Sequence, residues 1–286
     1  MTEPASPVVS ADPPASGSAP PGRPWLVRLQ VRGDDRAAIL TREILLVLGV
    51  SLGMSAIYSV VSLIAKLTAE QPLNQQTTAM NTPASSRPLL ALVLELLGVV
   101  STVLPALLAV HLLSRDRDWS PAAPRVGRLL GLDRQRWRFD LTSGVVLTLA
   151  IGVPGLALYF AARGLGLNTT VAAANLTEWW AAPVLVLIAA ANGIIEEVVV
   201  VGYLMIRLGQ SGWGVAAAIT FSALLRGTYH LYQGFGGFVG NAIMGVVFAL
   251  FFLRTRRLWP LILAHTLLDV VAFLGYTVLR DHVSWL

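Results

Sequence analysis

Two adjacent carboxylates, Glu196 and Glu197, lie within the apolar run IIEEVVVVGYL at 194–204. An unpaired carboxylate in an apolar environment costs several kcal/mol, so such a pair indicates a function or a strong partner. Two further apolar stretches carry polar residues four positions apart: RGTYH at 226–230 and HTLLD at 265–269. Carboxylates and imidazoles that converge can take up and give back protons, and can activate a water molecule for hydrolysis.

Helical spacing predicts which of these side chains share a face. Positions four apart on a helix point the same way, so Asn192, Glu196 and Val200 form a stripe that Tyr203 continues. The other pairs on common faces are Arg226 with His230, and His265 with Asp269. Each ionisable side chain costs at least ~2.5 kcal/mol at the centre of a bilayer. We therefore expect the three polar faces to turn toward one another and away from lipid.

Each polar group also has a structural interpretation. A lone buried His is usually a hydrogen-bonding residue between helices, and Glu95 is interpreted as a structural ion-pair partner. His111 and His282 lie near span ends, where solvent reaches them, and Asn241 adds one more amide. Two glutamates and two histidines on separate spans are harder to explain in this way, because their combined insertion cost is large.

The composition indicates that apolar membrane segments must position these groups. The chain has 286 residues, of which 55% are hydrophobic and 13% charged, against about 25% charged in a typical soluble domain. With no cysteine, disulfides, thiolate metal sites and cysteine nucleophiles are excluded. Lys and Arg exceed Asp and Glu by 21 to 16, but the arginines lie between apolar runs. They indicate membrane topology, and no nucleic-acid partner is expected.

The hydropathy pattern predicts an all-α polytopic membrane bundle of about seven transmembrane helices, because only helices or closed barrels span lipid. The predicted spans are 44–65, 89–113, 141–163, 180–206, 213–233, 237–253 and 259–279. An interfacial helix near 24–42 is an additional option. Residues 1–24, rich in Pro, Ala and Ser, form a predicted disordered tail without a cleavable signal peptide.

The arginines set the predicted orientation. They concentrate before span one, in the 114–140 loop, at Arg207 and at 254–257, whereas the loops near 67–88 and 164–179 hold almost none. This alternation predicts a multi-pass protein of the cell membrane with a cytoplasmic N terminus. This orientation also leaves a conflict. Counted at 1.5 Å per residue from the basic cytoplasmic ends, His230 would lie about 10–15 Å further from the cytoplasm than His265. The fifth span must therefore begin in the cytoplasm or tilt strongly, or its predicted boundary near 213 is wrong.

The three motifs resemble those of the CPBP family, the CAAX-processing and bacteriocin-immunity type intramembrane proteases, also called the Abi family. Its first motif corresponds to EEVVVVGYL (196–204), its second to RGTYH (226–230) and its last to HTLLD (265–269). The stretch RTRRLWPLILAH before the last motif is similar too. The resemblance divides the chain into N-terminal membrane helices at 25–178 and a catalytic core at 179–279.

Two positions depart from the family pattern. Val201 stands where an Arg is usual, and Arg226 stands where a Phe is usual. We expect the two departures to be linked, with Arg226 supplying from span five the cation that Glu197 lacks at 201. Arg226 should then approach Glu196 or Glu197 within about 4 Å. The alternative is that Arg226 reaches toward a lipid head group.

The resemblance implies roles for the motif residues. The catalytic residues it implies are Glu196, Glu197, His230, His265 and Asp269. Glu196 and His230 would hold and activate a water, and His265 with Asp269 would stabilise the oxyanion. Because an ionised Asp269 would repel an oxyanion, it is a weaker fit than the family's Asn and is expected to orient His265. Asn192, Arg226 and Asn241 are expected to support the site.

The cofactor is left open by the sequence. A divalent metal such as zinc has candidate ligands in Glu196, His230 and His265, yet there is no HExxH motif. A glutamate-bound water without metal fits the same residues equally well.

The expected function is an intramembrane endopeptidase acting on a membrane-associated peptide or protein. Two alternatives remain: a proton-coupled transporter, which also needs ionisable groups at mid-membrane, and a non-catalytic scaffold or immunity protein of the same family, for which Val201 is the main argument. The endopeptidase requires Glu196, His230 and His265 to converge within about 8 Å on one water-accessible cavity.

Overall fold

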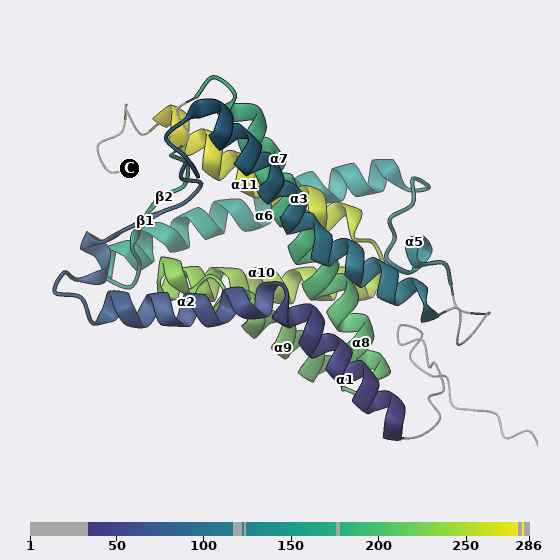
Figure 1. Ribbon diagram of the computed structural model, residues 1–286. Helices are drawn as coiled ribbons and strands as arrows, with labels where there is room; N and C mark the ends of the chain where they lie inside the picture. Colours follow the sequence, from purple (N-terminus) through teal and green to yellow (C-terminus); the bar gives the residue numbers. More distant parts are fainter. Residues whose placement is uncertain (1–33, 117–121, 123, 176–177, 280–281, 283–286) are drawn as a thin grey trace, which may run out of the picture.

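The chain is built almost entirely of helices. The computed structural model describes residues 34–116, 122, 124–175, 178–279 and 282 (Figure 1). Its only named strands, β1 (Thr77–Ala79) and β2 (Thr170–Ala172), pair in parallel over three residues in the described part of the chain. The predicted all-α class is therefore confirmed, while the predicted tail at 1–24 lies outside the described residues.

The described helices follow the predicted apolar segments, except that the predicted first span at 44–65 is interrupted between Gly49 and Leu52. In chain order they are α1 (Asp34–Gly49), α2 (Leu52–Leu67), the 3₁₀ turn η1 (Leu73–Gln75), α3 (Pro88–Ser114), α5 (Val126–Leu129), α6 (Trp137–Gly164), α7 (Ala181–Glu196), the π-helical η2 (Glu197–Tyr203), α8 (Leu204–Gln210), α9 (Val215–Thr228), the 3₁₀ turn η3 (Leu231–Gln233), α10 (Phe235–Thr255) and α11 (Trp259–Leu279). The described part of the option near 24–42, from Asp34 onward, is the beginning of α1.

Fewer helices than predicted are long enough to cross a bilayer. Among the described residues five qualify, or six if the bent pair α1 and α2 counts as one span with its 55° bend. The helix α9 has 14 residues and is thus about 21 Å long, less than the roughly 30 Å of a hydrocarbon core. The predicted boundary at 233 was wrong, because the helix ends at Thr228 and η3 follows. The apolar helices of the described residues are those of a multi-pass membrane protein.

The start of α9 bears on the predicted depth of His230. The helix begins at Val215, close to the predicted boundary near 213, and His230 lies between its end and the turn η3. Of the three explanations offered for the conflict with the depth of His265, a start in the cytoplasm and a tilt of the helix stay as predictions.

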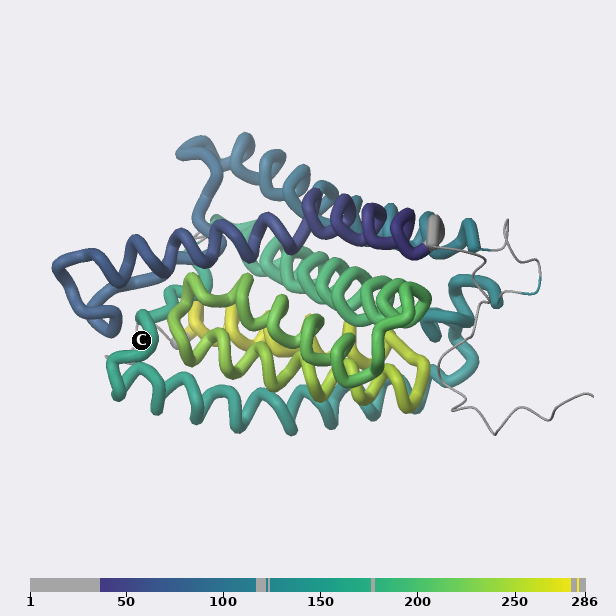
Figure 2. The backbone as a smooth tube through the Cα atoms, turned by 90° about the horizontal axis from the view of Figure 1, so that it is seen from below, coloured from purple at the N-terminus to yellow at the C-terminus, as the bar shows by residue number. Residues whose placement is uncertain are grey.

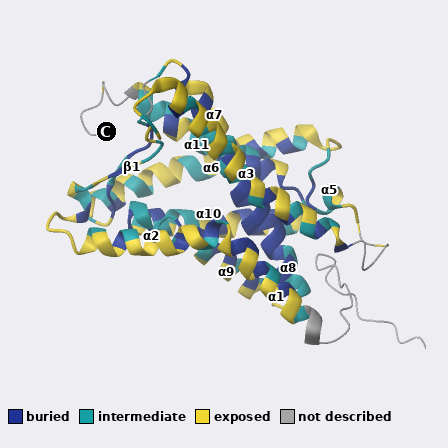
Figure 3. Ribbon diagram, viewed as in Figure 1, coloured by how far each residue is buried: buried dark blue, intermediate teal, exposed yellow. Residues whose placement is uncertain are grey.

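The continuous helix α7–η2–α8 lies at the centre of the bundle. In its most apolar stretch 67% of the residues are buried, whereas the share is at most 39% in the other candidate spans among the described residues. A helix that is apolar all round is expected to be enclosed by others. Figure 3 shows the buried residues concentrated around this helix, while the outer faces of α2, α3 and α6 are exposed.

The other helices enclose this central one. The helix α11 packs between α6 and α7, α3 packs on α7, and α9 packs on α10 and α2. Figure 2 shows α6 along one side of the bundle and α2 with α3 along the other. The N-terminal helices thus cover a core formed by residues after 180.

Two arginines that were interpreted as topology signals are buried in ion pairs. Arg207 is 1% exposed and bonds to Glu43 on α1 and Asp116 after α3. Arg257, between α10 and α11, bonds to Asp133 and Asp140. Besides any effect on orientation, these arginines tie the N-terminal helices to the core.

Candidate active site in the centre of the bundle

The Glu-Glu motif lies where the central helix changes from α to π geometry. Glu196 is the last residue of α7 and Glu197 the first of the π-helical η2. Four consecutive β-branched valines follow, and β-branched residues are crowded in an α-helix. The hydroxyl of Ser222 on α9 donates to the Val200 carbonyl at 2.9 Å, which satisfies an acceptor in the distorted turn. Such π turns frequently occur at functional sites.

Glu197 is fully buried between an arginine and a histidine from two other helices. Its Oε1 accepts a hydrogen bond from Arg226 Nη2 at 2.6 Å. The same oxygen lies 2.7 Å from His265 Nδ1. Helices α7–η2, α9 and α11 therefore meet at one carboxylate oxygen. The predicted approach of Arg226 to the glutamates is confirmed, and the alternative in which Arg226 reaches a lipid head group is excluded.

Glu196 lies beside Arg226 and His265 and accepts a hydrogen bond from a tyrosine. Tyr229 donates from its hydroxyl to Glu196 Oε2 at 2.8 Å. The same oxygen lies 3.8 Å from His265 Nε2 and 3.9 Å from Arg226 Nη1. Since Nδ1 of His265 is directed to Glu197, its Nε2 is the ring atom that faces Glu196. A single water could bridge such separations, each of which exceeds a direct hydrogen bond.

Arg226 fits because α9 and α10 approach closely. A Cβ atom at Gly245 would lie 3.0 Å from Ala223 Cα and 3.3 Å from Arg226 Cδ. The guanidinium carbon lies 5.5 Å from the centre of the Phe248 ring, which allows a cation–π contact. Atoms Nε and Nη1 of Arg226 and Oε2 of Glu197 are buried without a hydrogen-bond partner in the described structure. Two donor nitrogens and one acceptor oxygen are thus left without a hydrogen-bond partner at the site.

Asp269 and Asn192 lie at the more exposed edge of the cluster. Asp269 Oδ1 is 3.9 Å from His265 Nε2, and Asn192 donates to Asp269 Oδ2 at 3.2 Å. The side chain of Asp269 is 23% exposed, whereas that of Glu197 is fully buried. Asn241 is not joined to the cluster by any hydrogen bond of the described residues: its amide donates to Gly237 of its own helix.

His230 lies beside the cluster, after the end of α9. Its Nδ1 is 3.0 Å from the Arg226 carbonyl oxygen, and its ring packs against Tyr229 and Tyr232. It lies within electrostatic range of both Glu196 and His265. No ion pair within 4 Å joins it to either glutamate in the described structure. Convergence is therefore confirmed for Glu196 with His265, while a shared water-accessible cavity that includes His230 stays a prediction.

One predicted contact face is broken by the π turn. Tyr203 was expected to continue the stripe of Asn192, Glu196 and Val200, but its hydroxyl donates to Glu43 on α1 at 2.9 Å. A π turn needs more residues than an α turn, so side chains beyond it rotate away from the face that precedes it. Tyr203 belongs to the Arg207 ion-pair network instead.

The candidate ligands Glu196, His230 and His265 do not form a metal site as they lie. Among the described residues, no group of three or more His, Cys, Asp or Glu side chains is arranged to hold a metal ion. The Arg226 guanidinium also lies 3.9 Å from Glu196 Oε2, where it would repel a divalent cation. The residues therefore do not fit a bound zinc in this arrangement.

Four residues of the site were missed from the sequence. Tyr229 and Ser222 orient Glu196 and the π turn, while Gly245 and Phe248 make room for Arg226. Tyr229 directly precedes His230 in the second motif, so its polar hydroxyl in an apolar span was a usable signal. Nothing in the spacing distinguished Gly245 from the other glycines of α10.

Comparison with known proteins gives one match. Residues 178–271 match the family model described as type II CAAX prenyl endopeptidase Rce1-like. The match covers the central helix and all three motifs, and it assigns this segment to the CPBP/CAAX protease family. Searches of curated proteins and of solved structures gave no match.

Proposed function

We propose that this chain, whose residues 178–271 belong to the CAAX protease family, is an intramembrane endopeptidase that hydrolyses a peptide bond through a water activated by Glu196. The observation that carries the proposal is the meeting of Glu196, Glu197, Arg226 and His265 from three helices in one buried cluster. So many ionisable groups at the centre of a membrane bundle are costly unless they serve a function.

Glu196 is the proposed general base. Its carboxylate is anchored through Oε2 by Tyr229, so the second oxygen is free to accept a proton from water. The water oxygen then forms a bond to the carbonyl carbon of the scissile peptide, and the proton passes from Glu196 to the leaving amine as the carbon–nitrogen bond breaks. His230 lies near enough to help orient this water.

His265 is the proposed donor to the oxyanion. The 2.7 Å contact between its Nδ1 and Glu197 fixes the ring, and Nε2 then faces the space beside Glu196. The unpartnered Nη1 of Arg226 borders the same space and can donate a second hydrogen bond to developing negative charge. Asp269, which accepts from Asn192 and lies 3.9 Å from the same Nε2, orients His265 through its charge and is not itself placed to bind an anion.

The proposed substrate is a membrane-associated peptide or protein, since the site lies among apolar helices. The cytoplasmic N terminus, the location in the cell membrane and the catalytic core at 179–279 are parts of the same proposal. The proposal does not specify whether the substrate carries a prenyl group. The matched family is described by its prenylated substrates, whereas in the mechanism above the buried cluster acts only on the peptide bond.

The direct test is hydrolysis of membrane-associated peptides by the purified full chain in lipid vesicles. Matched peptides with and without a prenylated cysteine should be compared. We expect a time-dependent cleavage product that Glu196→Gln reduces by at least about 100-fold, the scale of a lost general base.

Unfolding curves in mixed micelles control for misfolding, because Glu196→Gln keeps the bond from Tyr229 and should unfold near the wild type. Cleavage that persists in Glu196→Gln would refute the assigned base. The absence of cleavage of any peptide in the panel, together with normal folding, would favour the non-catalytic scaffold.

A further inference from the structure

Lys66 is the only lysine in the sequence, and it lies in the last turn of α2. A lysine near a membrane surface usually extends its ammonium group into water or the head groups. Here the side chain turns inward, and Nζ donates to the Tyr232 carbonyl oxygen at 2.6 Å and to the Thr78 hydroxyl. None of the salt bridges among the described residues includes Lys66. The ammonium group therefore holds a backbone segment instead of an acid.

The backbone segment that Lys66 holds is the short turn η3, which several elements fix in place. The Tyr232 N–H donates to Ser59 Oγ at 2.7 Å, and Ser59 is 3% exposed on α2. The Thr169 N–H, just before β2, donates to the Gln233 carbonyl oxygen at 3.0 Å. Figure 1 shows β1 and β2 at the end of the bundle where α2 ends and α10 begins. A single 3₁₀ turn has poor hydrogen bonds of its own, so the bonds from these neighbouring elements determine where η3 lies.

The turn η3 connects these bonds to the candidate active site. His230 directly precedes it, and the Tyr232 ring stacks on the His230 ring with 6.2 Å between the ring centres and an angle of 24° between the planes. Tyr232 also lies within electrostatic range of Glu196 and Asp269. Within the described structure, the one hydrogen bond of the His230 side chain joins Nδ1 to the Arg226 carbonyl oxygen. A single bond leaves the tilt of the ring to its neighbours, so the Tyr232 ring helps to set where Nε2 of His230 points.

We propose that Lys66 is a positioning residue: by holding the Tyr232 backbone, it keeps the imidazole of His230 in place beside Glu196. The inference rests on the proposed hydrolysis, in which His230 orients the attacking water. Lys66 lies outside residues 178–271, which match the family model, so α2 supplies a part of the site that the match does not cover. Because a misplacement of about 1 Å can cost about 100-fold in rate, even a small shift of η3 should be measurable.

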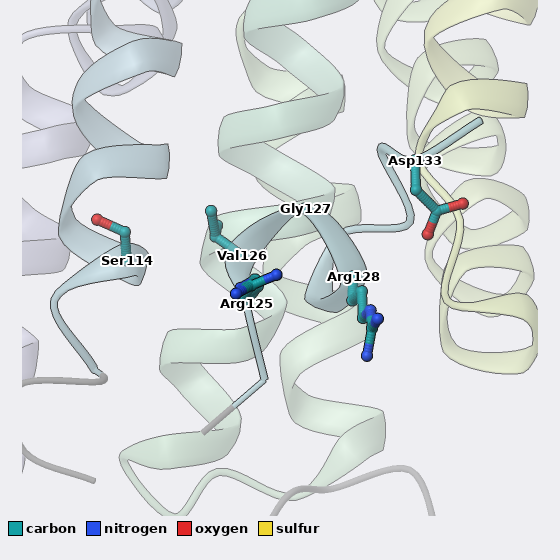
Figure 4. A pocket seen from close by; sticks show the side chains of 6 residues that line it. All are labelled: Ser114, Arg125, Val126, Gly127, Arg128 and Asp133. Carbon is teal, nitrogen blue, oxygen red and sulfur yellow. The ribbon is translucent and has the colours of Figure 1, made fainter. Parts of the chain in front are cut away.

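The first test is the neutral variant Lys66→Met in the vesicle assay, with kcat and KM measured separately. We expect kcat to fall about 10- to 100-fold, whereas KM stays at the wild-type value because Lys66 does not contact the peptide in the proposed mechanism. Arg128→Met is the matched control, because it removes one cation and adds the same side chain. Figure 4 shows Arg128 beside a pocket at the end of α3. This pocket lies near the start of the 28-residue helix α6, whereas Thr169 follows its far end, so the control should leave kcat unchanged.

Chemical rescue can separate the ammonium group from the bulk of the side chain. Because the sequence has no cysteine, Lys66→Cys introduces a single thiol. Bromoethylamine converts this thiol to a side chain of lysine length with a terminal ammonium group, and iodoethane adds the same two carbons without the amine. We expect aminoethylation to restore most of kcat and ethylation to restore none. Equal recovery with both reagents would overturn the proposal, because the position would then need bulk and not a donor.

A double-variant cycle tests whether Lys66 acts through His230. In the His230→Gln background, Lys66→Met should cause no further loss of kcat, because the ring that it positions is already absent. A general loss of structure would instead lower kcat by the same factor in both backgrounds, which would contradict the positioning role. Ser59→Ala leaves the Tyr232 N–H without its acceptor and should lower kcat in the same His230-dependent way. Ser55→Ala, at an exposed position of the same helix, should not.

The position of the His230 ring can also be measured without hydrolysis. The chain has four histidines, so labelled imidazoles give few NMR signals in mixed micelles, and His230→Gln identifies the signal of His230. Lys66→Met should shift or broaden that signal and leave the signal of His265 in place, since Glu197 holds His265 independently. If the wild type cleaves no peptide, the proposed hydrolysis fails, yet this measurement still decides the role of Lys66. An unchanged His230 signal in folded Lys66→Met would refute that role, and Ser59→Ala is measured in the same way if Lys66→Met does not fold.

Discussion

Arg226 is the only described arginine or lysine within 4 Å of either motif glutamate. It is fully buried, and its guanidinium stands against Glu197 at 2.6 Å and Glu196 at 3.9 Å. The family pattern has its arginine on the same helix as the glutamates, at the position of Val201, which is also fully buried here. The contact of Arg226 with Glu197 is what the expected exchange of the cation between helices requires.

Removal of this cation should strongly reduce both stability and hydrolysis. Arg226→Phe leaves two buried carboxylates whose remaining partners are His265 and, for Glu196, the Tyr229 hydroxyl. Breaking a buried pair costs about 3–5 kcal/mol of unfolding free energy. We expect that loss in mixed-micelle unfolding, together with the loss of peptide hydrolysis. Val201→Arg combined with Arg226→Phe restores the family pattern and should recover part of both quantities.

The single variant Val201→Arg completes the thermodynamic cycle. It brings a second cation near the first and should destabilise the wild-type background, so the two substitutions should couple favourably. A double variant that is no more stable and no more active than Arg226→Phe would refute the exchange of the arginine between helices.

The sequence predicted the helices that carry the motifs, but it predicted only part of the contacts between these helices. The i, i+4 pairs Arg226 with His230 and His265 with Asp269 were visible because α-helical spacing is regular. The π turn at Glu197 was not, since it depends on tertiary contacts such as the bond from Ser222 to the Val200 carbonyl. That turn directed Tyr203 away from the predicted face. The end of α9 at Thr228 was not predicted either.

The distance between α7 and α11 depends on a glycine at their crossing. A Cβ atom at Gly193 would lie 2.8 Å from Thr266 Oγ1 and 3.0 Å from the Ile262 carbonyl oxygen. Gly193→Ala should push the helices apart and lengthen the contact of His265 with Glu197. We expect a loss of about 1–3 kcal/mol in unfolding free energy and a larger proportional loss of hydrolysis than of folded protein.

Gly155→Ala on α6 is the matched control, because a Cβ atom there has nothing within 4 Å. It should be neutral or stabilise by up to about 1 kcal/mol, since alanine favours the helix. If Gly193→Ala behaves like Gly155→Ala, the close crossing does not position His265.

At the scale of the whole molecule, hydropathy correctly predicted apolar helices long enough to cross a membrane, but the charge pattern did not predict the contacts of individual arginines. The positive-inside pattern assigns every arginine between spans to solvent or head groups. Arg207 and Arg257 instead satisfy buried carboxylates that come from distant parts of the chain. Partners such as Glu43, 164 residues before Arg207, cannot be assigned from sequence spacing. The seven predicted spans likewise assumed full crossings, whereas α9 with its 14 residues is shorter than a helix that crosses a bilayer.

The Arg207 network should hold the N-terminal helices on the core. Its guanidinium bonds to Glu43 on α1, to the Leu112 carbonyl on α3 and to Asp116 after it. Arg207→Met leaves both acids without their cation, and we expect a loss of about 3–5 kcal/mol in unfolding free energy. The triple variant Glu43→Gln, Asp116→Asn and Arg207→Met removes all three charges and should be more stable than Arg207→Met alone, because an uncompensated charge costs more than a missing ion pair. If Arg207→Met unfolds at the wild-type midpoint, the network does not hold the layers together, and contacts between apolar helices alone must do so.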